Sequence, residues 1–509
     1  MDEKNKRIIK NTFFLYIRML LLIVVNFYTV RVVLQNLGVE NYGLYNVVGG
    51  FVSMIAFLNQ SMTNSIQRFM NYEIGRGEQN DVKKYFETAL LTQGLISLFV
   101  LISLETVGLW FLNTYMSIPE GSKLAANIVF QFSILSLLLK IIEAPFAAVI
   151  IAKERMGFYA VISLIEAFGQ MVIAFAIVIV QNKLESYSFM LLCLSCCILL
   201  SNIVYSRKLI TGLGIRIKYH KEALKEVLSF SGWNLFGAAS GTIKSQGINV
   251  LMNIFFGVVV NAARGVSFQV LGCLQRFVAN FQVAINPQIV QSYAARDYDR
   301  YRSLTFSSAK ISFALMWILT LPVVFCIGDL LALWLGEGNV PEYTDVFVKI
   351  ILFTGLVDAL GSSISVPLYA TGKIRNYQII VSSITIMVLP ISYALYKIGY
   401  PPMASMYVSL ILSIIAQLAR VKIWANQTNN KFWLYIKEII FPFLCVMSVS
   451  YLISYGVFYN LIEGANSYGK IIFIGFFTSI VNLLLIYLLV LSVNEKSFVK
   501  SKIYQKLHL

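Results

Sequence analysis

Charge is scarce in this chain of 509 residues, and histidine is nearly absent. Only 13% of the residues are Asp, Glu, Lys or Arg, whereas soluble domains carry about 25%. Hydrophobic residues make up 58% of the sequence and the mean hydropathy is +0.72, so little sequence remains for a soluble domain. These values predict an all-α integral membrane protein that crosses the bilayer many times.

The sequence also lacks the usual marks of catalysis. The two histidines, His220 and His508, fall in segments expected outside the membrane, so we expect neither catalysis nor metal binding from them. The six cysteines lie in apolar segments, which predicts buried thiols rather than a disulfide framework. No GxxxxGK[ST] motif occurs, which excludes a P-loop ATPase. The acidic pair of Asp297–Tyr298–Asp299 lies in a charged turn with no domain around it. We therefore expect no enzyme, no cofactor and no bound metal.

Long apolar runs dominate what is present. A helix needs about 20 mostly apolar residues to cross a bilayer. The first run is too long for the core of a signal peptide, so it is expected to be a retained span. The second, seventh and eighth runs are the weakest by hydropathy. The fourteen predicted spans are 11–33, 43–66, 86–112, 124–147, 158–181, 187–205, 227–255, 262–290, 304–328, 344–369, 377–396, 403–424, 436–459 and 470–492.

Lys and Arg are unevenly distributed over the expected loops. With a cytosolic N-terminus, 28 of the 41 Lys and Arg fall in cytosolic segments, Arg420 included, and four fall outside. This asymmetry fits the positive-inside rule and an even number of spans, with both termini in the cytosol. It also accounts for the formal net charge of +16 without any binding of nucleic acid.

The chain resembles itself at an offset of about 218–224 residues. The basic turn Ala152–Tyr159 follows the fourth span, and the similar turn Ala370–Tyr377 follows the tenth. Because six spans separate the copies, the two repeats run parallel, an arrangement in which transporters often bind substrate between the halves. We predict two six-helix lobes around a central cavity, plus two further helices. The expected parts are an N-lobe (1–205), a cytosolic linker (206–226), a C-lobe (227–424) and the last two spans with the tail (425–509).

We assign nine Lys and Arg to the membrane, against four acidic residues, Glu105, Glu143, Glu166 and Asp358. A cation in hydrocarbon costs at least a few kcal/mol, so such residues usually face a protein interior or a watery cavity. Those near span ends can extend toward the interface instead, as expected for Arg31, Arg68, Arg264 and Lys349. The remaining five are assigned to a cationic cavity: Arg18, Lys140, Lys244, Arg276 and Lys310.

Amide side chains share helix faces with these cations. In the eighth span, Gln269, Arg276 and Asn280 follow helical spacing. We assign ligand contacts to Asn26, Gln60, Asn64, Asn249, Gln269 and Asn280. The alternative is packing between membrane helices, which also uses Gly, Ser and Asn.

Two acidic residues, Glu143 and Asp358, are candidates for ion coupling or gating. Lys140 and Asp358 occupy matching positions at an offset of 218, which allows an ion pair between the lobes.

The segment Leu37–Tyr45, with the sequence LGVENYGLY, and the pair Asn11–Thr12 carry a family resemblance. Over essentially its whole length, the chain resembles the polysaccharide-exporter branch of the multidrug/oligosaccharidyl-lipid/polysaccharide (MOP) exporter superfamily. The resemblance implies a V-shaped pair of helical bundles that works by alternating access. It also implies that undecaprenyl-pyrophosphate-linked units of O-antigen or capsule cross the bacterial cytoplasmic membrane. It identifies no individual binding residue.

With this substrate, the cations would hold pyrophosphate and acidic sugars, and the amides would contact sugar hydroxyls. The expected partners are the lipid-linked anionic oligosaccharide, membrane lipid and the polysaccharide polymerase or chain-length machinery, with the protein itself a monomer. Two alternatives belong to the same superfamily: a drug or cation exporter and a peptidoglycan-precursor flippase. A membrane-bound glycan polymerase or ligase is expected to need larger outside loops than these.

Overall fold

The computed structural model of the chain describes residues 3–53, 56–77, 79–114, 120–210, 218–336, 340–461, 467–491 and 496–497. Within these ranges all regular elements are helical and none is a strand, as the composition predicts. In the first half of the chain the elements are α1 (Glu3–Ser53), α2 (Ala56–Arg76), α3 (Gln79–Ser103), the π-helix η1 (Leu104–Gly108), α4 (Leu109–Thr114), the 3₁₀ turn η2 (Glu120–Ser122), α5 (Lys123–Ala152), α6 (Met156–Ala176), the 3₁₀ turn η3 (Ile177–Ile179), α7 (Lys183–Leu209) and α8 (Lys221–Ala294).

The second half continues with nine further elements. They are α9 (Tyr298–Leu335), α10 (Thr344–Ala370), α11 (Arg375–Ile386), α12 (Val388–Lys397), α13 (Ala404–Thr428), α14 (Phe432–Tyr435) with the π-helix η4 (Ile436–Ile440), α15 (Phe441–Leu461) and α16 (Ser467–Leu489).

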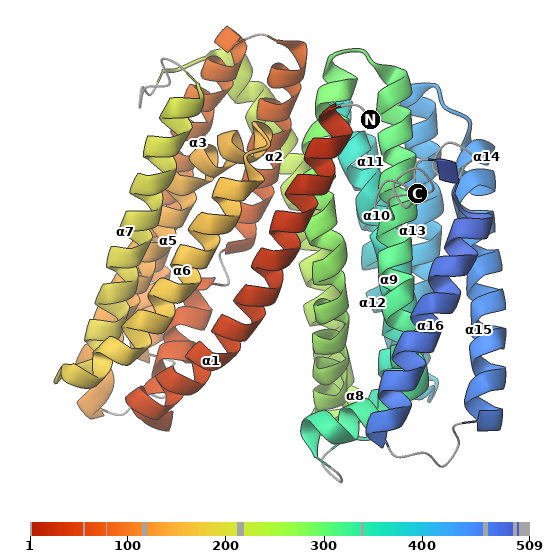
Figure 1. The fold of residues 1–509 in the computed structure, drawn as a ribbon. Helices are drawn as coiled ribbons and strands as arrows, with labels where there is room; N and C mark the ends of the chain where they lie inside the picture. Colours follow the sequence, from red (N-terminus) through yellow and green to blue (C-terminus); the bar gives the residue numbers. More distant parts are fainter. Residues whose placement is uncertain are drawn as a thin grey trace, which may run out of the picture. The chain divides into compact units, whose positions relative to one another are not determined.

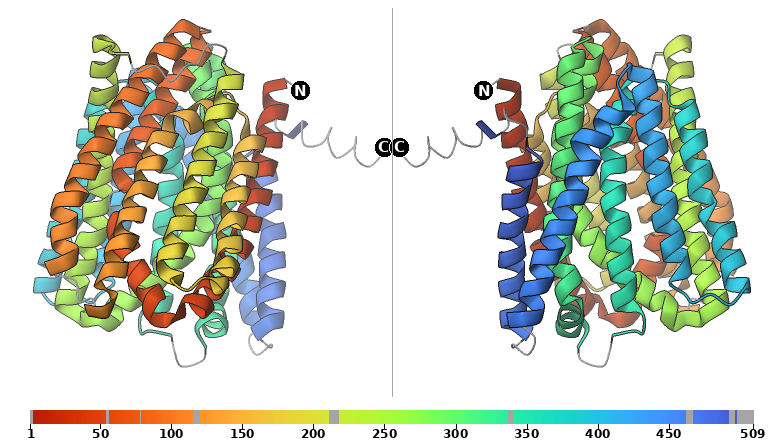
Figure 2. Two further views of the ribbon diagram at one scale, coloured as in Figure 1. Left: turned by 90° about the vertical axis from the view of Figure 1, so that its left-hand side faces the viewer. Right: turned by 90° about the vertical axis from the view of Figure 1, so that its right-hand side faces the viewer.

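The chain divides into two compact units. Unit 1 comprises Met1–Ala238 and Val283–Asp297, and unit 2 comprises Ala239–Gln282 and Tyr298–Leu509. Within each unit the long helices run side by side (Figures 1 and 2). Because α8 contributes to both units, a single helical element carries the chain from one to the other and back.

Eleven of the fourteen predicted spans are confirmed as helices long and apolar enough to cross a membrane, among the described residues. The three others, 43–66, 227–255 and 262–290, are helical in their described parts and are not among these eleven. They are also the three with the weakest hydropathy, because amide, hydroxyl and charged residues run along their faces.

Helix α8 spans 74 residues, about 110 Å if it were straight, more than three times the thickness of a bilayer core. It is interrupted at Gly257, where φ is 80° and ψ is −172°. A side chain disfavours this backbone conformation, and glycine adopts it readily. The interruption separates the predicted seventh and eighth spans.

Helix α1 continues through Leu37–Tyr45, where we expected a loop between the first two spans. That expectation is wrong for the backbone, which stays helical to Ser53. The segment contains no proline, and the side-chain amide of Asn41 donates to the Leu37 carbonyl at 3.2 Å, a contact compatible with a helical turn.

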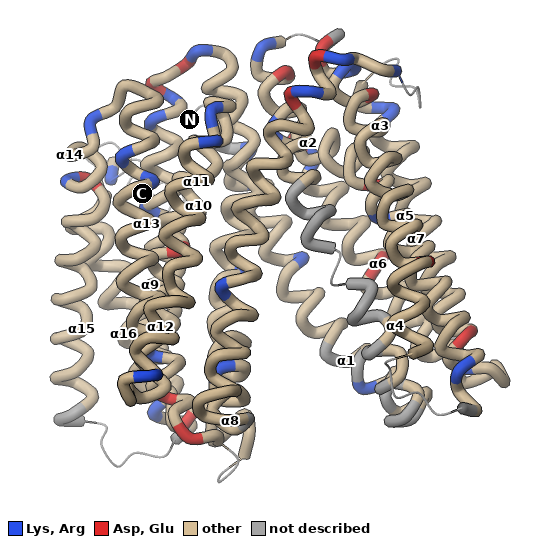
Figure 3. The backbone as a smooth tube through the Cα atoms, turned by 180° about the vertical axis from the view of Figure 1, so that it is seen from behind, with Lys and Arg blue, Asp and Glu red and all other residues tan. Residues whose placement is uncertain are grey.

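Two helices at equivalent repeat positions are central to their units. In unit 1, α5 packs against α1, α2, α3 and α7; in unit 2, α10 packs against α9 and α13. Helix α5 ends at Ala152 and α10 at Ala370, directly at the two basic turns that mark the repeat. Lys and Arg gather at one end of the helices of unit 1, as Figure 3 shows.

Candidate functional site

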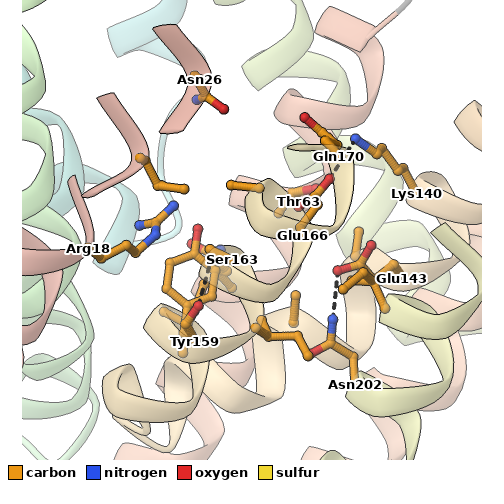
Figure 4. Close-up of a pocket in the computed structure, with 18 residues that line it drawn as sticks. Arg18, Asn26, Thr63, Lys140, Glu143, Tyr159, Ser163, Glu166, Gln170 and Asn202 are labelled. Atoms are coloured by element: carbon orange, nitrogen blue, oxygen red, sulfur yellow. Dashed lines mark hydrogen bonds and ion pairs between the residues drawn. The ribbon is translucent and has the colours of Figure 1, made fainter. Parts of the chain in front are cut away.

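Unit 1 contains a polar cavity of about 590 Å³. Five helices line it, and Figure 4 shows their polar side chains around one space. The polar lining residues are Arg18 and Asn26 on α1, Thr63 and Gln67 on α2, Lys140 and Glu143 on α5, Tyr159, Ser163, Glu166 and Gln170 on α6, and Asn202 on α7.

Helical spacing explains why these side chains meet. Residues three, four or seven apart lie on one face of a helix. On α5 this places Lys140 beside Glu143, and on α6 it aligns Ser163, Glu166 and Gln170. The cavity therefore forms where the polar faces of neighbouring helices coincide.

The two polar α5 residues of this cavity each form a polar pair with a residue of another helix. The ammonium of Lys140 lies 3.2 Å from a carboxylate oxygen of Glu166. These side chains are 51% and 34% exposed, so solvent screens their attraction and the pair contributes at most about 1 kcal/mol. Beside it, the amide nitrogen of Asn202 donates to the Glu143 carboxylate at 2.7 Å.

Arg18 has a different environment from Lys140. Its guanidinium lies over the Tyr159 ring, 4.6 Å from the ring centroid. Its Nε is buried without a hydrogen-bond partner, and it forms no ion pair with any described residue. A stacked guanidinium keeps its positive charge available to an anion, because an aromatic face does not neutralise it.

The cavity of unit 1 is formally neutral, because its two cations are matched by two carboxylates. We expected a cationic excess, and this cavity does not have one. The reason is Glu166, which α6 brings into contact with Lys140. The alternative pairing of Lys140 with Asp358, which would join the two units, stays a prediction.

In unit 2 the charges are unbalanced. The charged groups that act on the ammonium of Lys244 are Asp358, Arg420 and Arg264. Two of these three neighbours are cations, and Lys244 forms no ion pair within the described ranges. This group of unit 2 thus holds a positive excess that the unit 1 cavity lacks.

Arg264 does not extend to an interface as we expected. It is only 3% exposed, it stacks over Phe268 at 4.3 Å, and it donates to the side-chain oxygen of Asn249. The aromatic ring and the amide hold the guanidinium inside unit 2. Asn249 therefore binds a cation of its own unit.

The three polar residues that share a face of the eighth span are partly or fully exposed. Gln269 and Arg276 are exposed, and the side-chain amide of Asn280 donates to the backbone oxygen of Arg276 at 2.8 Å. Arg276 has no carboxylate partner among the described residues. Its charge is available to a ligand.

Lys310 lies elsewhere. It lines a separate cavity of about 340 Å³ with Asp299, Arg302 and Glu438, between the start of α9 and the α14–η4 segment. Two carboxylates face two cations there, so Lys310 is in a balanced environment rather than in a cationic one.

On α2, Thr63 and Gln67 line the unit 1 cavity, whereas Asn64 is partly buried and outside the lining set. The side chain of Gln60 lies outside the described part of the structure.

Several contributors were absent from the predicted site. Tyr159 marked one of the repeat turns, and its position one helical turn before Ser163 was the available signal. Glu166 was recognised as an acid within a span but had no assigned role. Arg420 was counted as a cytosolic cation, whereas it lies within α13 with Nε and Nη1 buried. Gln170 and Asn202 gave no signal beyond their polarity.

Residues 245–394 match the family model MatE. A search of curated proteins gives no match. Among solved structures, an outward-facing multidrug resistance MATE family transporter of the MOP superfamily superposes with a TM-score of 0.70 at 12% identity, covering 84% of this chain and 97% of that one. The chain has the MATE fold.

Two further structures support this fold. A MATE protein in the bent conformation gives a TM-score of 0.65 at 14% identity, with 84% and 96% of the two chains covered. A MOP superfamily transporter from Pyrococcus furiosus gives 0.65 at 12% identity with the same coverage, and its binding pocket is described as reversed in polarity, suggesting a different function for that protein. At these identities the likeness concerns the fold alone.

Proposed function

We propose that the chain is a MOP-type transporter that flips anionic, pyrophosphate-linked oligosaccharides across the bacterial cytoplasmic membrane by alternating access. The observation that carries this proposal is the positive excess in unit 2. Lys244, Arg276 and Arg420 have no carboxylate within ion-pair distance among the described residues. Uncompensated cations in a membrane-embedded bundle are costly, so a natural anionic ligand is the simplest reason to keep them.

The parts of the headgroup would be recognised differently. Arginine suits phosphate because its planar fork bonds two oxygens at once. The exposed Gln269 would bond sugar hydroxyls. The polyprenyl tail would stay in the lipid. Glu143 and Asp358 remain our candidates for ion coupling, since Glu143 lines the unit 1 cavity with Lys140 and Glu166 and Asp358 acts on Lys244.

A second candidate is a drug or cation exporter of the same superfamily. The two carboxylates of the unit 1 cavity, Glu143 and Glu166, favour it, because an organic cation could replace Lys140 at Glu166. A peptidoglycan-precursor flippase is a third, which the same cationic groups would serve.

The test is a flipping assay with purified protein in liposomes that carry a fluorescent, pyrophosphate-linked polyprenyl oligosaccharide. A membrane-impermeant quencher then reports how fast label from the inner leaflet becomes accessible. We expect rapid exchange with the wild type and about tenfold slower exchange for Arg276→Gln, since a charge-assisted hydrogen bond is worth about 1.5–3 kcal/mol.

Lys349→Gln is the matched control, because Lys349 lies near Asp345 at 3.9 Å on its own helix and has no assigned role. Absence of exchange by the wild type, together with reduced ethidium accumulation in an overexpressing strain, would favour the cation exporter instead.

A further inference from the structure

The two units differ at one pair of repeat-related positions. In unit 1, Glu143 on α5 accepts a hydrogen bond from Asn202 on α7 at 2.7 Å. At the repeat offset of 218 found between Ala152 and Ala370, the equivalent residues are Gly361 on α10 and Arg420 on α13. A carboxylate and an amide in one unit thus correspond to no side chain and a guanidinium in the other.

The Gly361–Arg420 contact shows that this correspondence holds in space as well as in sequence. A Cβ on Gly361 would lie 2.7 Å from Nη1 and 3.2 Å from Cζ of Arg420. The missing side chain therefore lets the guanidinium lie against the α10 backbone. Any larger residue would have to displace it.

The guanidinium of Arg420 is placed in this notch without a neutralising partner. Its Nε and Nη1 are buried and form no hydrogen bond to any described residue, and it forms no ion pair there. A buried, unsatisfied charged donor costs more than a neutral one, so a structure that retains it normally supplies an acceptor.

A second cation lies near Arg420. Both Arg420 and Asp358 act electrostatically on Lys244 of α8. Asp358 is three residues before Gly361, on the same face of α10. Asp358 is the one carboxylate among the charged groups that act on Lys244, while Arg264 is held by Asn249 and Phe268. The group retains a net positive charge that one oxyanion would balance.

We propose that Arg420 and Lys244, with Gly361 making room, form an oxyanion-binding site in unit 2 for a phosphate-type group. Asp358 acts on Lys244 but forms no ion pair with either cation among the described residues. Resting on the proposed function, this assigns the pyrophosphate of the lipid-linked substrate to unit 2. The repeat-related Glu143–Asn202 pair of unit 1 has the opposite preference, because a carboxylate repels the same ligand.

The experiment uses the full-length protein in nanodiscs and titrates inorganic pyrophosphate by calorimetry. We expect saturable binding by the wild type. Arg420→Gln and Gly361→Ala should each weaken it about tenfold, equivalent to about 1.4 kcal/mol. Gly361→Ala acts by pushing the guanidinium out of its notch. Arg420→Lys keeps the charge but loses the fork and should fall between wild type and Arg420→Gln, whereas Lys349→Gln should bind as the wild type does.

Wild-type affinity in folded Arg420→Gln would overturn the site. If Arg420→Gln does not give a monodisperse protein, Gly361→Ala and Arg420→Lys carry the test, and unchanged binding by both would overturn it equally.

A second arm adds polyprenyl pyrophosphate to the nanodisc: displacement of inorganic pyrophosphate supports the lipid-linked ligand, and absence of competition overturns that assignment in favour of a free anion. Arg420-dependent binding without flipping would leave the site standing while the transport proposal fails. Flipping that is insensitive to Arg420→Gln would support the transport proposal and overturn the site.

Discussion

The unit 1 cavity and the Lys244–Arg420 group of unit 2 lie on related helices, yet they differ in the balance of positive and negative side chains. In unit 1 each carboxylate has a nearby donor, Lys140 for Glu166 and Asn202 for Glu143, and the cavity is neutral. In unit 2 one carboxylate, Asp358, and two cations, Arg420 and Arg264, act on Lys244. Repeat-related helices can thus differ in chemistry, because a few side chains on their faces decide the local charge.

The largest effect is expected at Asp358. Replacing it by Asn removes the carboxylate that acts on Lys244, which should destabilise the fold by about 2 kcal/mol because the ammonium then has only cations among these charged neighbours. Thermal unfolding in detergent at low salt measures the loss. Added pyrophosphate should restore more stability to this variant than to the wild type.

Glu143→Gln is the matched change in unit 1. Because its partner Asn202 is neutral, the loss should be only about 1 kcal/mol, the value of an ordinary hydrogen bond. Equal losses for the two variants would remove the contrast between the units.

The next effect concerns glycines. In unit 1 a Cβ on Gly75 would lie 2.5 Å from the backbone oxygen of Gln291 and 2.6 Å from its Cα, so α2 touches the backbone of α8. Gly75→Ala should cost about 1–3 kcal/mol by overpacking. Gly361→Ala in unit 2 should cost less, because it meets the end of a flexible arginine.

Unfolding midpoints of both variants measure this difference, with Gly94→Ala as the control, since nothing lies within 4 Å of a Cβ there. A larger loss for Gly361→Ala than for Gly75→Ala would show that the Arg420 notch is rigid, contrary to our interpretation.

A smaller effect is expected for the Arg18–Tyr159 stack of unit 1. Tyr159→Leu removes the ring beneath the guanidinium, a contact worth about 0.5–2 kcal/mol. We expect flipping to slow a few fold through weaker substrate binding, while Tyr159→Phe retains the ring and the rate. The liposome assay at several substrate densities tests this, and an equal defect in both variants would assign the role to the hydroxyl.

The smallest effect is expected for the Lys140–Glu166 pair. Both side chains are at least a third exposed, so a double-mutant cycle with Lys140→Gln and Glu166→Gln should give a coupling of about 0.2–1 kcal/mol in stability. The coupling should shrink in high salt. A coupling of several kcal/mol would mean that the pair is shielded from water.

Much of the fold was accessible from hydropathy and charge. Eleven spans and the all-helical class follow from runs of apolar residues, since a helix satisfies its own backbone in lipid. The second, seventh and eighth spans were the weakest by hydropathy because they carry polar faces. The helical backbone at Leu37–Tyr45 was missed because its glycines and polar residues are typical of a turn, whereas the helix continues through them.

The candidate site was predictable only within single helices. Phase along α1 and charge within a predicted span identified Arg18, Asn26, Lys140 and Glu143, which the structure gathers in one cavity, although their role in binding stays a prediction. Pairing between helices could not be predicted, because no spacing along the sequence relates Glu166 on one helix to Lys140 on another. Arg420 could have been found from its repeat equivalence to Asn202, but its position near a span end made it look cytosolic.

The most direct test compares substrate affinity between the two units. Binding of a pyrophosphate-linked oligosaccharide to the protein in nanodiscs would be measured for Lys244→Gln and Arg420→Gln in unit 2, and for Glu143→Gln and Glu166→Gln in unit 1. We predict that both cation variants weaken binding about tenfold or more, since each loses a charge-assisted contact, while the two carboxylate variants bind at least as tightly as the wild type. Loss of affinity in the carboxylate variants with normal affinity in the cation variants would contradict an anionic substrate held by unit 2.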